Sequence, residues 1–171
     1  MPNRDGPRGF IPRFHLFGST IKVEHVTLAA ANAAVGVGDP LVEGTDGRMD
    51  RAAAGDPIGG IAAAAAAASS AATIPVYRDP GIVFSAQTDD GTGVATAETA
   101  INLNINFIAG APSGGRSISE LDESSATTTA TLPFKIRGRW LSPDNAFGEF
   151  NELLVTVNNH KDKGGTGTVG L

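Results

Sequence analysis

Eight consecutive residues, 101–108, alternate apolar and amide side chains without interruption. Successive residues of a β-strand point to opposite faces, so one face carries Ile101, Leu103, Ile105 and Phe107 and the other carries Asn102, Asn104 and Asn106. Asparagine is a poor strand former, and tertiary packing therefore has to hold this segment extended. The pattern predicts a strand with one face in a core. The amide face is either an ordinary solvent-exposed face or a neutral contact surface.

Turn signals divide the rest of the chain into short segments. The sequence contains 22 glycines and 10 prolines, and no long stretch has the period of an amphipathic helix. Many short strands separated by turns are typical of an all-β protein, and we expect a small β-barrel or β-sandwich. The expected strands are 21–28, 35–42, 57–61, 74–77, 82–88, 101–108, 134–141 and 153–157, with a turn at 44–47.

Two segments leave the helical alternative open. Residues 62–68 are seven consecutive alanines. Alanine has the highest helix propensity, but the run is short and has no polar face. It predicts either a short helix or small-residue packing against a close neighbour. Residues 117–124 are compatible with one helical turn.

The composition limits both the core and the surface. The 171 residues suggest one domain; 41% of them are apolar, but only 6% are aromatic. Alanine dominates the apolar fraction and buries little area, so we expect a thin core or one that a partner completes. The net charge is −5, yet the first 22 residues hold four cations and one carboxylate, which leaves −8 for the remainder. A basic segment on an acidic body predicts docking on an acidic neighbour, including another copy of the chain.

The domain organisation follows from these features. Residues 1–20 contain three prolines and three glycines together with apolar side chains such as Phe10 and Phe14. This pattern predicts an extended arm that either clamps its own domain or reaches a neighbour. Residues 21–160 form the expected β-barrel body, and the Gly/Thr/Lys-rich residues 161–171 form a flexible tail. No secretory leader or membrane-spanning stretch is recognised, so we expect synthesis in the cytoplasm as a soluble protein.

No constellation of catalytic or metal-binding residues emerges. The chain has no cysteine, and His15, His25 and His160 lack the spacing of a metal site. No Gly-x-Ser-x-Gly elbow is present, which argues against nucleophilic catalysis. We therefore expect no enzymatic activity, no metal and no cofactor.

Three further patterns favour structural interpretations. Residues 89–91 (Asp-Asp-Gly) resemble part of a calcium loop but lack its other ligands, which favours a turn. The glycine-rich loop 110–116 lacks the ending of a phosphate-binding loop. Lys135, Arg137 and Arg139 would share one strand face without interleaved aromatic residues. They predict a solvated face or intersubunit ion pairs.

Six short motifs follow one another along the chain. They are 3–12 (Asn-Arg-Asp-Gly-Pro-Arg-Gly-Phe-Ile-Pro), 38–42 (Gly-Asp-Pro-Leu-Val), 77–87 (Tyr-Arg-Asp-Pro-Gly-Ile-Val-Phe-Ser-Ala-Gln), 121–127 (Leu-Asp-Glu-Ser-Ser-Ala-Thr), 142–148 (Ser-Pro-Asp-Asn-Ala-Phe-Gly) and 154–160 (Leu-Val-Thr-Val-Asn-Asn-His). In this order they resemble a group of tailed-phage virion proteins. The seven-alanine run and Pro40 depart from the family pattern.

This group is the family of head decoration, or capsid cement, proteins. The resemblance implies a structural protein on the outer surface of the capsid that braces the shell by bridging subunits of the major capsid protein. It implies a small β-barrel or β-tulip with an extended arm, assembled as a homotrimer or, less favoured, a dimer. It implies no direct contact with nucleic acid or membrane, and synthesis in the cytoplasm of the bacterial host.

The residues expected at the capsid or intersubunit interface belong to the arm and to the amide face. Arginine and aromatic side chains are the usual anchors of interfaces. The predicted interface residues are Arg4, Arg8, Phe10, Arg13 and Phe14, with Asn102, Asn104 and Asn106 as a second surface. Two other classes compete with this one: a virion module that binds a host receptor or glycan, and a hydrolase on a β-scaffold. The single tryptophan and single tyrosine argue against the first, and the missing site argues against the second.

Overall fold

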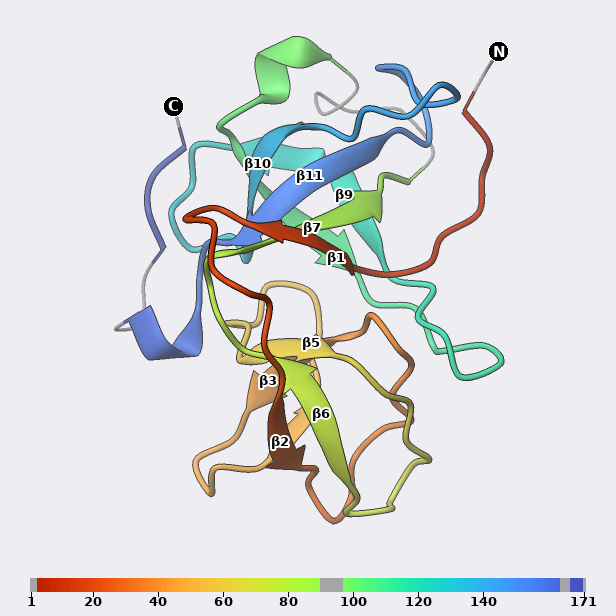
Figure 1. Ribbon diagram of the computed structural model, residues 1–171, viewed down its shortest axis with the longest axis vertical. Helices are drawn as coiled ribbons and strands as arrows, with labels where there is room; N and C mark the ends of the chain where they lie inside the picture. The colour runs from red at the N-terminus through yellow and green to blue at the C-terminus, as the bar shows by residue number, and fades with distance from the viewer. Residues whose placement is uncertain (1–2, 90–96, 164–166, 171) are drawn as a thin grey trace.

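The computed structural model describes residues 3–89, 97–163 and 167–170, and its named strands form two antiparallel sheets (Figure 1). The six-stranded sheet has the spatial order β1 (Ile11–His15), β7 (Ile82–Gln87), β11 (Glu152–Val157), β10 (Phe134–Arg139), β8 (Asn104–Ile108) and β9 (Glu120–Thr127). The five-stranded sheet has the order β2 (Glu24–Thr27), β6 (Thr73–Tyr77), β5 (Gly60–Ala62), β3 (Pro40–Glu43) and β4 (Met49–Arg51). Among the described residues there is no α-helix, only the short 3₁₀ helices η2 (Glu98–Ala100) and η3 (Lys161–Lys163). The all-β prediction is confirmed.

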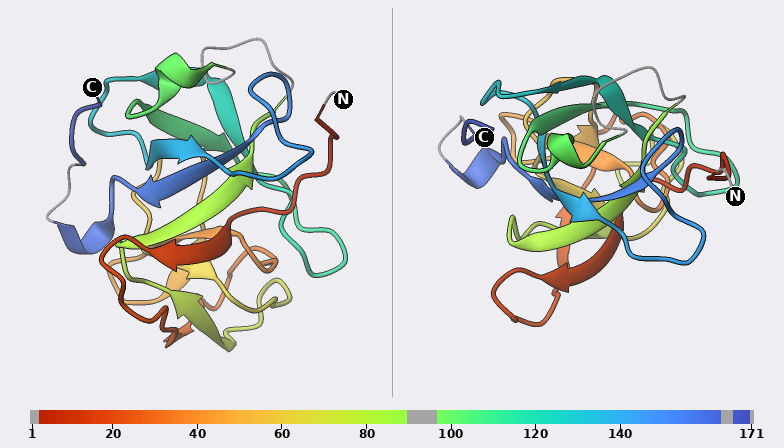
Figure 2. Two further views of the ribbon diagram at one scale, coloured as in Figure 1. Left: turned by 45° about the horizontal axis from the view of Figure 1, so that its top comes forward. Right: turned by 90° about the horizontal axis from the view of Figure 1, so that it is seen from above.

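The sheets do not close into a barrel. β1 and β9 remain the two edges of the six-stranded sheet, and the two sheets lie one above the other (Figures 1 and 2). The barrel prediction is therefore wrong. Two antiparallel sheets sharing one core satisfy the same turn-rich sequence pattern, because each sheet buries one face against the other.

β7 shows how the local sequence produces the sheet. Ile82 and Phe84 point into the main core, whereas Val83 and Ser85 point to the opposite face. The strand has neighbours on both sides, β1 and β11, and all four of these side chains are fully buried. A strand covered on both faces needs a nearly continuous apolar run. This explains why the segment is one of the most apolar in the chain.

Three phenylalanines form the centre of the main core. Phe10 stacks on Phe134 with ring centroids 4.3 Å apart, and Phe107 meets both rings edge-on at 6.2 and 5.9 Å. The rings come from the N-terminal segment, β10 and β8. Such aromatic pairs add roughly 0.5–1.5 kcal/mol each beyond the area that they bury. The core therefore depends on a residue that lies outside the sheets.

The five-stranded sheet separates this core from a second, smaller one. In β5, Ile61 belongs to the main core and the next residue, Ala62, belongs to the small core. In β6, Val76 faces the small core and Tyr77 packs against the main core. The strand period of two thus puts apolar residues on both faces of the sheet.

The seven-alanine run covers the small core without forming a helix. Ala64 and Ala66 pack against this core, and Ala66 forms a bridge with Val35. The Ala63 N–H donates to Pro75 O at 2.9 Å. Small side chains let this extended segment lie close to its neighbours, so of the two alternatives left open by the sequence, small-residue packing is the one observed.

The strand boundaries differ from the predicted ones in several places. The predicted segments 82–88 and 134–141 contain β7 and β10, and the predicted segments 74–77 and 153–157 match β6 and β11 except for the first residue of each strand. The segment 21–28 contains the whole of β2, whereas 35–42 and 57–61 overlap β3 and β5 only in part. The strands β1, β4 and β9 were not predicted. The helical turn expected at 117–124 is wrong, because most of that segment belongs to β9.

The alternating segment 101–108 also begins differently. β8 starts at Asn104, after η2, and Asn102 has a φ of 75° in the left-handed region. Asparagine tolerates this conformation better than most residues. The strand prediction is therefore wrong for the first three residues of the segment.

The N-terminal segment is integrated into the fold rather than extended from it. Residues 11–15 form the edge strand β1, and Phe10, 1% exposed, is part of the core. Gly9 makes this entry possible because its φ is +67° and a Cβ there would collide with Ser117 and Gly38 O. An arm without regular structure is thus not observed over these residues.

The C-terminal residues 167–170 lie on the body of the protein. The Asn158 Oδ1 accepts the Thr168 N–H at 2.9 Å, the Lys135 Nζ donates to Val169 O at 3.0 Å, and the Gly170 N–H donates to Thr128 O at 3.1 Å. These contacts differ from the loose tail expected for 161–171. Residues 164–166 and 171 of that tail lie outside the described residues.

Candidate interaction surface

The predicted interface residues of the N-terminal segment separate into buried and exposed groups. Phe10 is consumed by the core and presents no surface to another molecule. Arg4 and Arg8 are exposed, and Phe14 is 45% exposed. The segment that carries them is tied down by Gln87, whose side chain accepts the Gly6 N–H at 3.0 Å and donates to Arg4 O at 2.7 Å. The exposed members therefore stay available for contacts, on a fixed backbone.

A polar hollow of about 260 Å³ lies beside Arg4 and Arg8. It is formed where the N-terminal segment passes the loop that connects β10 to β11. Its lining residues are Asn3, Arg4, Gly6, Arg8, Gly9, Ile11, Gln87, Ser142, Asp144, Asn145, Phe150 and Glu152. The lining mixes cations, carboxylates and amides.

Arg13 is fixed on the outer face of the six-stranded sheet. Its Nη2 lies 2.9 Å from the Glu152 Oε1, and its Nε donates to the Ser85 Oγ at 2.7 Å. The guanidinium carbon lies 4.2 Å from the ring centroid of Trp140. An arginine held by a carboxylate, a hydroxyl and an indole is a rigid feature of the surface rather than a mobile anchor.

Next to Arg13, the chain carries an exposed apolar segment, which we define as Phe14, Leu16 and Phe17. Leu16 is 41% exposed and Phe17 is 82% exposed. His15, buried between them, accepts the Phe17 N–H at its Nδ1 (3.1 Å), and its Nε2 lies 3.0 Å from the Asp79 Oδ2. The histidine therefore holds the exposed apolar segment in place at the end of β1.

The amide residues do not form a common exposed surface. Asn104 is fully buried, and its Nδ2 donates to Thr129 O at 3.0 Å and to Thr168 O at 2.7 Å. The Asn106 Oδ1 accepts the Gly55 N–H at 2.8 Å. Asn102 precedes the strand. Because the buried Asn104 side chain bonds Thr168 of the C-terminal residues, the predicted second contact surface is not present as a flat amide face.

The cations of β10 also differ from the prediction. The register between β10 and β11 shifts between Ile136 and Gly138, so this bulge moves Arg139 away from the face of Arg137. The Arg137 Nε donates to the Thr156 Oγ1 at 3.0 Å on the outer face. Arg139 instead lies over the ring of Phe147 at 5.4 Å. The three cations therefore do not share one face.

An ion-pair cluster joins the C-terminal segment to the five-stranded sheet. Arg78 lies 2.8 Å from Glu43, 3.2 Å from Asp162 and 3.8 Å from Glu24. Beside it, the His160 Nδ1 accepts the Asp162 N–H at 3.1 Å. Burial lowers the pKa of His160 below its ordinary value of 6.5, so the ring is held neutral.

The patterns that suggested ligand chemistry do not assemble into a site in the described part of the chain. No group of three or more His, Asp or Glu side chains there could hold a metal ion. In the 110–116 loop, the backbones of Ser113 and Arg116 hydrogen-bond each other in a tight turn. Residues 90 and 91 of the calcium-like pattern lie outside the described residues. No described helix is long and apolar enough to span a membrane.

The sequence interpretation overlooked several surface residues. Trp140 stacks with Arg13, and Leu141 beside it is 80% exposed. The signal was available, since Trp140 is the single tryptophan and follows a cation-rich strand.

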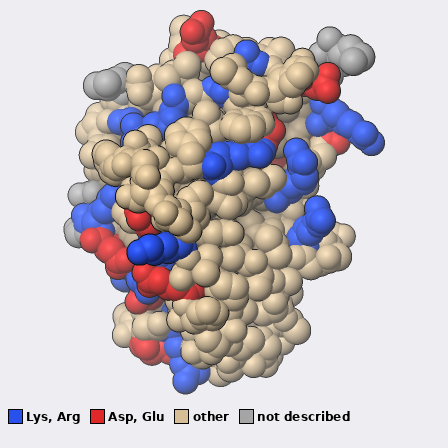
Figure 3. All heavy atoms as spheres, in the orientation of Figure 1, with Lys and Arg blue, Asp and Glu red and all other residues tan. Residues whose placement is uncertain are grey.

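In the view of Figure 3, cationic side chains gather over the six-stranded sheet, and a largely uncharged surface covers much of the five-stranded sheet.

Comparisons with protein-family models, with curated proteins and with solved structures find no match to this chain.

Proposed function

We propose that the chain is a structural virion protein that binds the outer surface of a phage capsid. In this proposal it stabilises the shell by bridging subunits of the major capsid protein, and it acts as a homotrimer or a dimer. The observation that carries the proposal is the exposed apolar segment, which a buried histidine holds at the edge of a rigid sheet. The ordered series of motifs that resembles decoration proteins supports the same class.

The exposed side chains suit a contact that is repeated by symmetry. Phe14 and Phe17 offer apolar area, and Arg4 and Arg8 offer charge on the same N-terminal segment. Each contact is small, but several copies linked in one oligomer bind far more tightly than one copy does. In this proposal the N-terminal segment, which lies along the body, takes the place of the extended arm of decoration proteins. The expected location of the protein is the virion surface.

A second candidate function follows from the polar hollow of about 260 Å³. Its mixture of amides, carboxylates and arginines favours hydrogen bonding to a hydroxylated ligand. A virion module that binds a host glycan would use such a hollow. A glycan titration that moves signals of Asn3 or Ser142 would favour this alternative.

The test of the first proposal is co-sedimentation with empty capsids of the phage that encodes the chain. Deleting residues 1–20 is unsuitable, because it would remove Phe10 from the core and β1 from the sheet. The better variants are Leu16→Ser and Phe17→Ser, which change exposed positions. Val37→Ser, at an exposed apolar residue outside this segment, is the matched control.

We expect saturable binding at a symmetric copy number. The Leu16→Ser and Phe17→Ser variants should weaken binding, whereas the control should bind like the wild type. Absence of binding by the folded wild-type protein would refute the capsid proposal and leave the receptor- or glycan-binding function as the better candidate.

A further inference from the structure

The outer face of the six-stranded sheet is formed by residues that the strand alternation turns away from the main core. In register across the sheet, Phe14 pairs with Val83, Val83 with Thr156, and Thr156 with Lys135. Val83 and Thr156 are buried although they point away from the core. Phe14 is therefore the cross-strand neighbour of Val83 on this face, and Arg137 lies at Thr156, where its Nε donates to the Oγ1 at 3.0 Å.

Arg137 and Lys163, two cations near this outer face, have no carboxylate partner among the described residues. Arg137 contacts Thr156, and the Lys163 Nζ contacts Val157 O at 3.4 Å. No ion pair is formed by either side chain within the part of the chain that the structure describes. Nearby, Asp79 is already bonded to His15 and to the Gly81 N–H.

The electrostatics agree with this absence of counter-charge. Burial lowers the pKa of Lys163, and repulsion from Arg137 lowers it further, against a smaller opposing effect of Asp79. Burial also lowers the pKa of Arg137. A carboxylate placed between the two cations would stabilise both charged forms.

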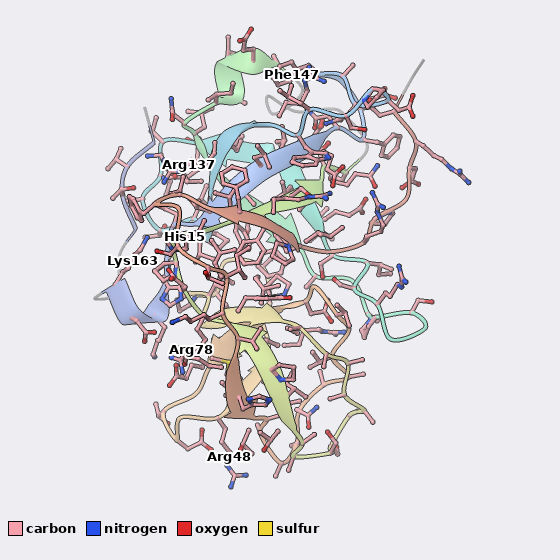
Figure 4. All side chains as sticks on the ribbon, in the orientation of Figure 1. His15, Arg48, Arg78, Arg137, Phe147 and Lys163 are labelled. Atoms are coloured by element: carbon pink, nitrogen blue, oxygen red, sulfur yellow. The ribbon has the colours of Figure 1, made fainter. Side chains whose placement is uncertain are left out.

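The exposed apolar segment lies at the same end of the molecule. Figure 4 shows Arg137, His15 and Lys163 at one side of the structure, and His15 lies between Phe14 and Leu16 in sequence. The ring of His15 is 5.7 Å from the ring of Phe17. Exposed apolar side chains and two cations that have no carboxylate partner among the described residues thus lie on the same side of the molecule.

We propose that Arg137, Lys163 and the exposed apolar segment form one docking surface for a protein partner whose own surface presents carboxylates beside apolar side chains. The inference rests on the proposed function and deepens it, because it names the chemistry of the partner surface. Because Arg137 and Lys163 have no carboxylate partner among the described residues, we expect carboxylates on the surface of the partner. The net charge of −5 and the aliphatic Leu16, on which a base cannot stack, favour a protein over a nucleic acid.

The test uses the intact chain labelled with ¹⁵N and a soluble peptide of alternating glutamate and leucine. A peptide with lysine in place of glutamate and a single-stranded oligothymidine serve as the competing probes. We expect the glutamate peptide to shift amide signals at 14–17, 135–137 and 161–163 and nowhere else. The effect should weaken at high salt, because the charges are near the surface.

The double variant Arg137→Gln and Lys163→Gln should weaken binding of the glutamate peptide by about fivefold for each charge removed. Arg48→Gln is the matched control. Arg48 is an exposed cation at the far end of the molecule, with Asp46 as its partner 3.9 Å away (Figure 4). This variant should bind like the wild type, and dispersed spectra of all variants show directly that they fold.

Several outcomes would overturn the inference. These are no shifts with the glutamate peptide, equal binding of the lysine peptide, preferential binding of the oligothymidine, or an equal loss in Arg48→Gln.

A different pattern of binding results separates this inference from the proposed function. Peptide binding that needs Arg137 and Lys163, without any binding to capsids, would refute the capsid role and leave the acidic-partner surface standing.

Discussion

Replacing Phe10 by alanine tests whether the N-terminal segment is part of the folded body or a separable arm. Phe10 is 1% exposed, stacks on Phe134 at 4.3 Å and meets Phe107 edge-on. If the segment were an arm that orders only on a partner, the free protein would not depend on this side chain. The structure predicts a strong dependence.

The expected magnitude follows from burial and ring contacts. Truncating a fully buried phenylalanine to alanine costs about 3–5 kcal/mol, because apolar area is lost and a cavity remains. The two lost ring pairs place Phe10→Ala toward the upper part of this range. For a chain of this size, each kcal/mol changes Tm by roughly 2–4 °C, so we expect a fall of about 8–20 °C.

The assay is thermal unfolding followed by circular dichroism, with urea unfolding as the second measurement. Phe17→Ala is the control, since it removes the same atoms from a side chain that is 82% exposed. It should change stability by less than about 0.5 kcal/mol. If Phe10→Ala and Phe17→Ala have the same small effect, Phe10 is not a core residue in solution and the arm prediction is restored.

Three further perturbations probe the contacts that join the segments. The pKa of His160 in the folded protein lies below the value of 6.5 expected in the unfolded chain, so protonation of this ring favours unfolding. The contribution of neutral His160 to the free energy of unfolding is complete above pH 6.5 and is lost as the pH falls through the folded pKa. Urea unfolding between pH 7.5 and 5.5 should show this slope in the wild type and in His25→Gln, but not in His160→Gln. Asn158→Ala leaves Ala130 O, Leu132 O and the Thr168 N–H without their side-chain partner; hydrogen exchange should then accelerate at 168, with a loss of about 1–3 kcal/mol. Arg78→Ala removes contacts to three carboxylates; we expect a loss of about 1–2 kcal/mol that shrinks in high salt, and an equal loss at all salt concentrations would contradict the ionic interpretation.

The strands that were predicted well from the sequence are those rich in apolar side chains that the sheet buries. β7 and β11 each have four apolar residues out of six, and most of their residues are buried because each strand has a neighbour on both sides. β9 could not be predicted in this way, because Glu120–Thr127 is mostly acidic and hydroxylated and lies at a sheet edge. β1 contains Pro12, which a sheet tolerates at its edge but which the sequence pattern assigns to an irregular segment.

The candidate surface was predictable in composition but not in position. Phe10, Phe14 and three arginines of the N-terminal segment were expected at an interface, yet only the fold separates buried Phe10 from exposed Phe14. Phe17, the most exposed of these phenylalanines, was not among the predicted interface residues. Likewise, a strict alternation cannot distinguish an amide that faces solvent from one that bonds a distant backbone. Asn104 does the latter, to residues 25 and 64 positions away.

The N-terminal segment is already ordered before any partner binds, and this affects the free energy of binding. A free arm loses about 1–2 kcal/mol of backbone conformational entropy for each residue that it orders on its partner. Here β1 is already paired with β7, and the His15 Nδ1 already accepts the Phe17 N–H. Phe14 and Phe17 are therefore presented without that loss at the moment of binding, which favours affinity from a small contact. In the proposed capsid role, the body does more than carry the contact residues, because by folding it has already met the entropic cost of holding them in place.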